Sequence, residues 1–127
     1  MGKILIVEDN EANMYLISFI LKKYGYSVIE ARNGEEGVMC AINERPELII
    51  MDIDLPKTDG YETASRIRSL ETEGNRIPLI ALTSYAMAGD KEKAIEAGCT
   101  GYMEKPINPD TFITEIEKYL NKSAPEP

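Results

Sequence analysis

The sequence predicts an α/β protein built on a doubly wound parallel sheet, with helices on both faces of the sheet. Two observations support this prediction. Short apolar runs alternate with segments of helical periodicity, and five such pairs follow one another along the chain, which is typical of consecutive strand–helix units. The length of 127 residues is that of one common domain and leaves no room for a second substantial core.

Five stretches are predicted to be strands. Four of them read as buried strands of a parallel sheet, namely Ile4–Val7, Leu48–Met51, Leu79–Leu82 and Thr100–Met103. The fifth, Ser27–Ala31, mixes polar with apolar side chains. We therefore expect that stretch to lie at an edge of the sheet.

The first predicted helix spans about Glu11 to Tyr24. Asn10 is placed to cap its N-terminus, and Gly25 follows its last residue, where a left-handed backbone often ends a helix. Its apolar side chains recur at helical spacing and are expected on one face, which consists of Met14, Ile17, Leu21 and Tyr24.

The second and fifth helices are also marked by their ends. Asn33 and Glu36 stand three residues apart, which resembles a capping box, and Pro46 closes the second helix. For the fifth helix, Asn108 is the expected N-cap and Pro109 the first helical residue. The apolar face of that last helix consists of Phe112, Ile113, Ile116 and Leu120.

The third and fourth helices have weaker signals. The third contains Tyr61, Ile67 and Leu70 and leads through a polar loop into the fourth strand. The segment 86–97 carries only a weak apolar stripe before Gly98. We expect a loosely anchored helix there.

The composition excludes several kinds of partner and site. The formal net charge is −8, whereas wide contact with nucleic acid or an anionic membrane depends on clustered lysine and arginine. No apolar stretch approaches the roughly 20 residues of a membrane-spanning helix, and the first residues do not read as a signal peptide, so a cytoplasmic protein is expected. The chain has no histidine, which excludes histidine nucleophile pairs and histidine metal sites.

Polar residues follow the predicted strands, and they are expected to meet. In the flavodoxin-like strand order 2-1-3-4-5, the first and third strands are neighbours, and ligands bind beyond the carboxyl ends of the strands. That order would place Glu8 and Asp9 opposite Asp52, with Thr83 on the far side of Asp52 and Lys105 one strand further. We therefore expect one acidic site at this end of the sheet.

Three carboxylates in one crevice repel each other and attract a cation. Two unit charges about 5 Å apart cost roughly 3 kcal/mol at an effective dielectric near 20. The formal charges of Glu8, Asp9, Asp52 and Lys105 leave two negative charges, which a divalent ion balances. Because the candidate ligands are all oxygens, Mg²⁺ or Mn²⁺ is favoured over Zn²⁺.

A carboxylate beside such an ion and a lysine can act as a nucleophile toward phosphorus and form an aspartyl phosphate. Asp52, flanked on both sides by the other groups, is the expected acceptor. The phosphorylated form carries additional negative charge and needs further hydrogen-bond donors. The hydroxyl of Thr83 is the expected donor.

Four motifs occur in order along the chain and at suitable spacing. They are Ile-Val-Glu8-Asp9-Asn10, Met-Asp52-Ile-Asp54-Leu-Pro, Leu-Thr83-Ser84 and Lys105-Pro106. With these motifs the chain resembles a receiver domain of the two-component response regulators, of the chemotaxis-regulator type, over essentially its full length. We expect a receiver domain over residues 1–121 and a disordered tail over residues 122–127.

The resemblance implies a role for each site residue. Glu8, Asp9, Asp52 and Asp54 would form a Mg²⁺ site, with Asp54 contributing its backbone carbonyl. Asp52 would accept phosphate from a phosphohistidine of another protein, and Lys105 would hold the phosphoryl group. Glu8 stands where this family more often has aspartate, and its additional methylene suits metal contact through water.

The resemblance also implies a switch and a set of partners. Thr83 and Tyr102 would move together upon phosphorylation, and the peptide bond before Pro106 would be cis. The expected partners are a sensor histidine kinase or a histidine phosphotransfer protein, together with an output protein. The protein is expected to be a stand-alone receiver, a monomer or weak dimer, and no enzyme beyond its own phosphotransfer and autodephosphorylation.

Three other interpretations compete with this one. The chain would be a receiver-like interaction module that works without phosphorylation, or a receiver that belongs to a hybrid histidine kinase. A Mg²⁺-dependent phosphatase that works through an aspartyl phosphate is less favoured, because no substrate-selecting segment follows Asp54 in the sequence.

Overall fold

A computed structural model describes residues 2–54, 60–71, 76–84, 90–105 and 107–123. Its strands form a five-stranded sheet in the order β2-β1-β3-β4-β5, and each neighbouring pair is parallel. The predicted flavodoxin-like order is therefore confirmed, with the stretch of mixed polarity at an edge. The strands are β1 Lys3–Val7, β2 Ser27–Ala31, β3 Leu48–Asp52, β4 Leu79–Thr83 and β5 Gly101–Glu104.

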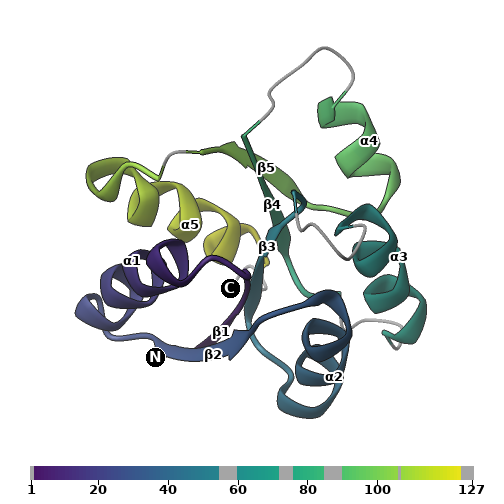
Figure 1. Ribbon diagram of the computed structural model, residues 1–127, viewed down its shortest axis with the longest axis horizontal. Helices are drawn as coiled ribbons and strands as arrows, with labels where there is room; N and C mark the ends of the chain where they lie inside the picture. The colour runs from purple at the N-terminus through teal and green to yellow at the C-terminus, as the bar shows by residue number, and fades with distance from the viewer. Residues whose placement is uncertain (1, 55–59, 72–75, 85–89, 106, 124–127) are drawn as a thin grey trace.

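Helices cover both faces of the sheet, as Figure 1 shows. Helices α1 (Glu11–Lys23) and α5 (Pro109–Ser123) lie together on one face. The opposite face carries α2 (Gly34–Glu44), α3 (Gly60–Leu70) and α4 (Asp90–Glu96). In the part of the chain that is described, no helix combines the length and apolarity needed to cross a membrane.

The sheet divides the hydrophobic core into two clusters. Side chains alternate between the two faces of a strand, so along β1 the residues Ile4 and Ile6 pack toward α1 and α5, whereas Leu5 and Val7 pack toward the other helices. All five residues of β3 are buried. The continuous apolar runs in the sequence thus arise because β1, β3 and β4 are covered on both faces.

The predicted helix caps are present. The side chains of Asn10 and Asn33 each accept a hydrogen bond at 2.9 Å, from the backbone N–H groups of Asn13 and Glu36 respectively. Asn108 accepts one at 2.9 Å from the backbone of Asp110 at the start of α5. These bonds satisfy donors that the first turn of each helix leaves without an intrahelical partner.

The structure differs from the predictions mainly at the ends of helices, both in the exposure of side chains and in where helices begin and end. Tyr24 and Leu70, expected among the apolar helix residues, are 47% and 54% exposed. Tyr24 is the C-cap of α1 and Leu70 the last residue of α3, so both lie at the C-terminal end of a helix. Helix α5 continues to Ser123, past the expected end of the domain at residue 121. Of the weakly predicted segment 86–97, α4 covers Asp90–Glu96, and residues 85–89 lie outside the described residues.

A polar network closes the end of the sheet opposite the strand carboxyl ends. The guanidinium of Arg68 donates to the carbonyl of Gly98 at 2.7 Å and to the carbonyl of Ile77 at 2.6 Å. It also pairs with Glu71 at 2.9 Å, and both side chains are largely buried. Arg68 therefore joins the end of α3, the approach to β4 and the segment between α4 and β5.

Candidate functional site

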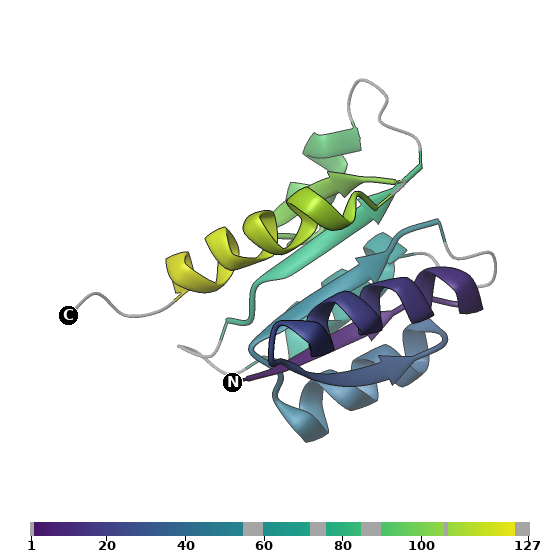
Figure 2. The same ribbon diagram turned by 90° about the vertical axis from the view of Figure 1, so that its left-hand side faces the viewer.

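Because the strands are parallel, their carboxyl ends all lie at the same end of the sheet, as the view in Figure 2 shows. Asp52 is the last residue of β3 and Thr83 the last residue of β4. Glu8 follows β1 directly, and Lys105 follows β5. The strand order therefore brings together residues that are far apart in sequence, at the edge where ligands bind in sheets of this kind.

Three of the predicted carboxylates form one cluster. Oxygen atoms of Glu8, Asp9 and Asp52 all lie within 4.8 Å of one another. Glu8 and Asp52 are only 1% and 3% exposed, whereas Asp9 is exposed. The cluster thus has two buried members and one that faces the solvent.

Glu8 occupies an unfavourable position for an ionised carboxylate. Its Oε2 accepts the backbone N–H of Asn10 at 3.2 Å, but its buried Oε1 has no hydrogen-bond partner among the described residues. Burial, reinforced by the neighbouring Asp52 carboxylate, raises the pKa of Glu8 to about 7. A buried oxygen that accepts no hydrogen bond, in a cluster whose possible metal ligands are all oxygens, fits a hard divalent ion such as Mg²⁺.

Lys105 supplies the positive charge of the site. Its Nζ lies 2.8 Å from Oδ2 of Asp52, 4.0 Å from Oε1 of Glu8 and 3.8 Å from Oδ2 of Asp54. Burial acts to lower the pKa of Lys105, but the bond to Asp52 and the surrounding carboxylates outweigh it, so this pKa is raised. Lys105 is therefore a fixed cation in contact with Asp52.

Asp54 connects the end of β3 to the end of β4. Its backbone N–H donates to Oδ1 of Asp52 at 2.8 Å. Its carboxylate turns to β4, where Oδ2 accepts the backbone N–H of Ser84 at 2.7 Å and Oδ1 accepts the hydroxyl of Thr83 at 3.4 Å. The role predicted for Asp54 concerned its backbone carbonyl, so sequence reasoning missed both this side-chain role and Ser84.

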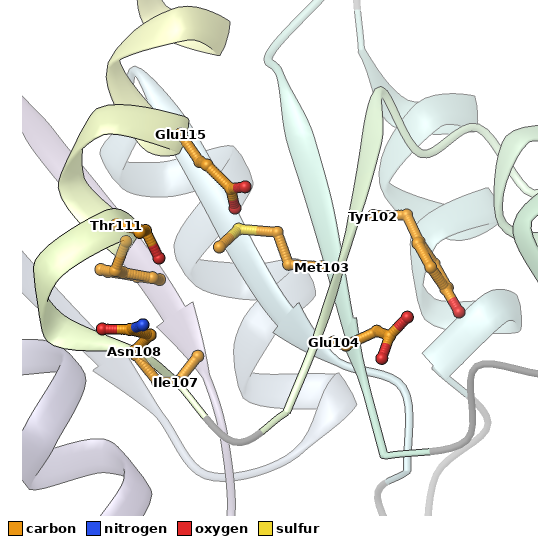
Figure 3. A pocket seen from close by; sticks show the side chains of 8 residues that line it. Tyr102, Met103, Glu104, Ile107, Asn108, Thr111 and Glu115 are labelled. Carbon is orange, nitrogen blue, oxygen red and sulfur yellow. The ribbon is translucent and has the colours of Figure 1, made fainter.

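Tyr102 lies within β5, which pairs with β4, the strand that ends at Thr83. It pairs with Ala81, two residues before Thr83. Figure 3 shows its ring on the opposite side of β5 from Met103, and it packs against the core on the side of α3 and α4. Pro106, the predicted site of a cis bond, lies outside the described residues.

A groove of about 350 Å³ lies between β5 and α5. Met103, Ile107 and Phe112 supply its apolar side chains and Glu115 of α5 a carboxylate, whereas the lining residue Glu104 has its carboxylate on the same side of β5 as Tyr102 (Figure 3). The remaining lining residues are Tyr102, Asn108 and Thr111. This groove lies beside the strand that carries the predicted switch tyrosine.

Comparison with known proteins agrees with this geometry. Residues 4–117 match the model of the response regulator receiver domain. The chain is 43% identical over 117 residues to the polar-differentiation response regulator DivK of Brucella anthropi, covering 92% of this chain and 94% of that protein.

Solved structures of receiver domains are also similar. A CheY-like receiver domain protein from Methanospirillum hungatei superposes with a TM-score of 0.88 at 30% identity, covering 97% of this chain and 96% of that one. The receiver domain of the sensor histidine kinase PA1611 from Pseudomonas aeruginosa, whose structure has a magnesium ion coordinated in the active site cleft, gives a TM-score of 0.84 at 35% identity. That alignment covers 94% of this chain and 98% of the neighbour.

Fold, site and sequence therefore lead to the same family. The parallel sheet places an acid pair, a buried aspartate, a threonine and a lysine at one edge, and the family model spans almost all of the described sheet and helices. Receiver domains are signalling modules of two-component systems. The chain belongs to the response regulator receiver domain family.

Proposed function

We propose that the chain is a phospho-accepting receiver in which Asp52 takes a phosphoryl group from a phosphohistidine of a partner protein, in a Mg²⁺-dependent reaction. The observation that carries this proposal is the position of Asp52. Its carboxylate is buried at the end of β3, in contact with the Lys105 ammonium at 2.8 Å and within the cluster formed with Glu8 and Asp9. No histidine occurs in the chain, so the donor imidazole must belong to another protein.

In the reaction, a carboxylate oxygen of Asp52 forms a bond to phosphorus while the bond from phosphorus to the donor nitrogen breaks. The imidazole leaves with the electron pair of that bond. Lys105 and the backbone N–H of Asp54 hold the two oxygens of Asp52 at 2.8 Å each and so fix the direction of the nucleophile. Lys105 is also placed to stabilise negative charge on the transferring group.

The residues that would hold Mg²⁺ are Glu8, Asp9 and Asp52, with the backbone carbonyl of Asp54 as a further ligand suggested by family resemblance. The clustered oxygens support this assignment, as does Oε1 of Glu8, which accepts no hydrogen bond from the described residues. When bound, the ion would offset charge on the carboxylates and on the phosphoryl oxygens. A similar receiver with a coordinated magnesium ion adds support from outside the chain.

Phosphorylation would then shift the protein between two states. The aspartyl phosphate carries more negative charge than the carboxylate and recruits hydroxyl and N–H donors. Thr83 supplies a hydroxyl at the end of the neighbouring strand, and Tyr102 would follow its movement because β4 and β5 are paired. The output is a changed surface around β5 that an effector protein reads.

The proposal includes the setting of the protein. The donor is a sensor histidine kinase or a histidine phosphotransfer protein of the cytoplasm, and the resting receiver is a monomer or weak dimer. Nucleic acid and membranes are not its partners, because the net charge is −8.

The test is uptake of phosphate from a phosphorylated histidine donor, followed by intact-protein mass spectrometry with and without Mg²⁺. Wild type should gain one phosphoryl group only when Mg²⁺ is present, and Asp52→Asn should gain none. Asp110→Asn makes the same chemical change at an exposed residue and should behave as wild type. The proposal would be refuted if Asp52→Asn took up as much phosphate as wild type. It would also be refuted if wild type bound the phosphorylated histidine donor but took up no phosphate.

A further inference from the structure

The carboxylate of Asp54 occupies a central place among the hydrogen-bond donors of the site. It accepts the backbone N–H of Ser84 at 2.7 Å and the hydroxyl of Thr83 at 3.4 Å. The same Oδ2 atom that binds Ser84 lies 3.8 Å from Nζ of Lys105. A hydroxyl, an N–H and an ammonium are thus directed at one anionic side chain.

These donors also surround Asp52, because Lys105 contacts its carboxylate and Thr83 directly follows Leu82, which pairs with Asp52 in register. Asp52 and Asp54 are joined by the bond from the Asp54 N–H to Oδ1 of Asp52 at 2.8 Å, and Lys105 lies between their carboxylates. Phosphoryl oxygens are strong acceptors and form their best hydrogen bonds with N–H groups and cations. Since a backbone N–H makes one strong bond at a time, the Asp54 carboxylate and a phosphoryl group would compete for Ser84.

We infer that Asp54 is an internal competitor of the phosphoryl group. In the resting protein its carboxylate holds the Thr83–Ser84 segment and attracts Lys105, and these donors must leave it before they can bind the modified Asp52. Asp54 would thus bias the equilibrium toward the resting state and set how strongly the site responds to phosphorylation. This inference rests on the proposed function, because it requires Asp52 to be the acceptor.

The position of Asp54 permits such an exchange. Its side chain is 22% exposed, in contrast to the 4% of Asp52, so the released carboxylate can be hydrated at small cost. Ser84 is an exposed residue beyond the end of β4, where it can move without breaking the sheet ladder. The competitor and the segment it holds therefore lie at the rim of the site, whereas the acceptor stays in the sheet.

The experiment compares binding of beryllofluoride, an analogue of the phosphoryl group, to wild type, Asp54→Asn and Asp54→Ala at saturating Mg²⁺, followed by NMR. Both variants should bind roughly tenfold more tightly than wild type, which is the effect of losing one hydrogen bond to a charged group. Without beryllofluoride, the Ser84 amide should exchange with solvent faster in both variants than in wild type, because its acceptor is weakened or removed. A thermal melt checks that each variant is folded.

The matched control is Glu104→Gln. Glu104 is an exposed carboxylate that pairs with Thr83 in register, so this change removes a nearby negative charge without removing the acceptor of the Ser84 amide. It should alter beryllofluoride binding by less than about twofold, as expected for an exposed charge.

Equal tightening in Asp54→Asn and Glu104→Gln would overturn the inference, because the effect would be one of net charge. Weaker binding in the Asp54 variants would overturn it too, since Asp54 would then support the switched state. A wild-type protein that shows no binding at all would instead remove the proposed function, and with it the basis of this inference.

Discussion

The ammonium group of Lys105 lies 2.8 Å from Oδ2 of Asp52, although Asp52 ends β3 and Lys105 follows β5, with β4 between the two strands. Both side chains are mostly buried, with 15% and 4% of their surface exposed. A buried ion pair of this kind is costly to break from one side, because the remaining charge has no partner and little water. Lys105 should therefore matter for stability, apart from the role proposed for it in phosphotransfer.

Replacing Lys105 by methionine should destabilise the metal-free protein by about 3 kcal/mol at neutral pH, as measured by urea unfolding. The control is Lys3→Met, which breaks the exposed pair of Lys3 with Glu44 at 3.2 Å and should cost less than about 1 kcal/mol. If the two substitutions cost the same, the pair with Asp52 contributes no more than a surface contact.

The pKa of Glu8 predicts how stability depends on pH. The pKa is 4.5 in the unfolded chain and about 7 in the folded protein, so folding favours the protonated form. The resulting stabilisation is complete below pH 4.5 and is lost as the pH rises through 7. In the presence of a chelator, the free energy of unfolding of wild type should fall by about 3 kcal/mol between pH 4.5 and a pH above 7, relative to a variant that lacks the Glu8 carboxylate.

That variant is Glu8→Gln, which resembles the protonated acid in shape and does not titrate. Urea unfolding of both proteins at intervals between pH 4.5 and 8 gives the difference directly. A difference that stays constant across this range would show that Glu8 titrates normally in the folded protein.

Replacing Thr83 by alanine should leave phosphorylation of Asp52 intact but abolish the response of Tyr102 to it. Asp52, Lys105 and the acid pair remain, so phosphate uptake should persist within a few-fold of wild type. Because the hydroxyl is lost, the amide signal of Tyr102 should no longer shift when beryllofluoride and Mg²⁺ are added. Thr114→Ala, at an exposed position of α5, is the control and should retain the shift. A normal Tyr102 response in Thr83→Ala would mean that the hydroxyl is not part of the switch.

Gly98 should tolerate no side chain. Its φ of +104° is unfavourable for other residues, and a Cβ atom there would lie 2.5 Å from Cγ of Arg68. Gly98→Ala should cost about 2–3 kcal/mol, as measured by urea unfolding. Gly25→Ala, at a similar φ of 93°, tests the backbone strain alone and should cost about 1–2 kcal/mol. Equal costs would show that the Arg68 side chain yields freely.

Local sequence signals predicted most of the fold. The strand limits at Ser27 and Ala31 agree with the structure, and the capping residues Asn10, Asn33 and Asn108 act as expected. These features depend on residues close together in the sequence, because a cap bonds to the helical turn that follows it and the side chains of a strand alternate between its two faces. The clustering of Glu8, Asp9 and Asp52 was predictable as well, since it follows from strand order alone.

The remaining features depend on contacts between distant segments. The hydrogen bond from the Ser84 N–H to Asp54 spans 30 positions, and the bond from Arg68 to the carbonyl of Gly98 also spans 30. No periodicity or capping rule indicates which of the many acidic residues or arginines will form a bond across the fold. Tyr24 and Leu70 are likewise exposed at the C-terminal ends of their helices, and helical spacing does not predict which turn of a helix is the last to be covered.

The placement of Asp52 on β3 has a consequence for the durability of the molecule. β3 is hydrogen-bonded to β1 on one side and to β4 on the other, so the proposed acceptor belongs to the part of a protein that opens least often. Thr83, Ser84 and Lys105, by contrast, stand where strands β4 and β5 give way to the segments that follow them. In the proposed function, phosphate would therefore be added to and removed from a strand that stays folded, and only the ends of β4 and β5 would rearrange.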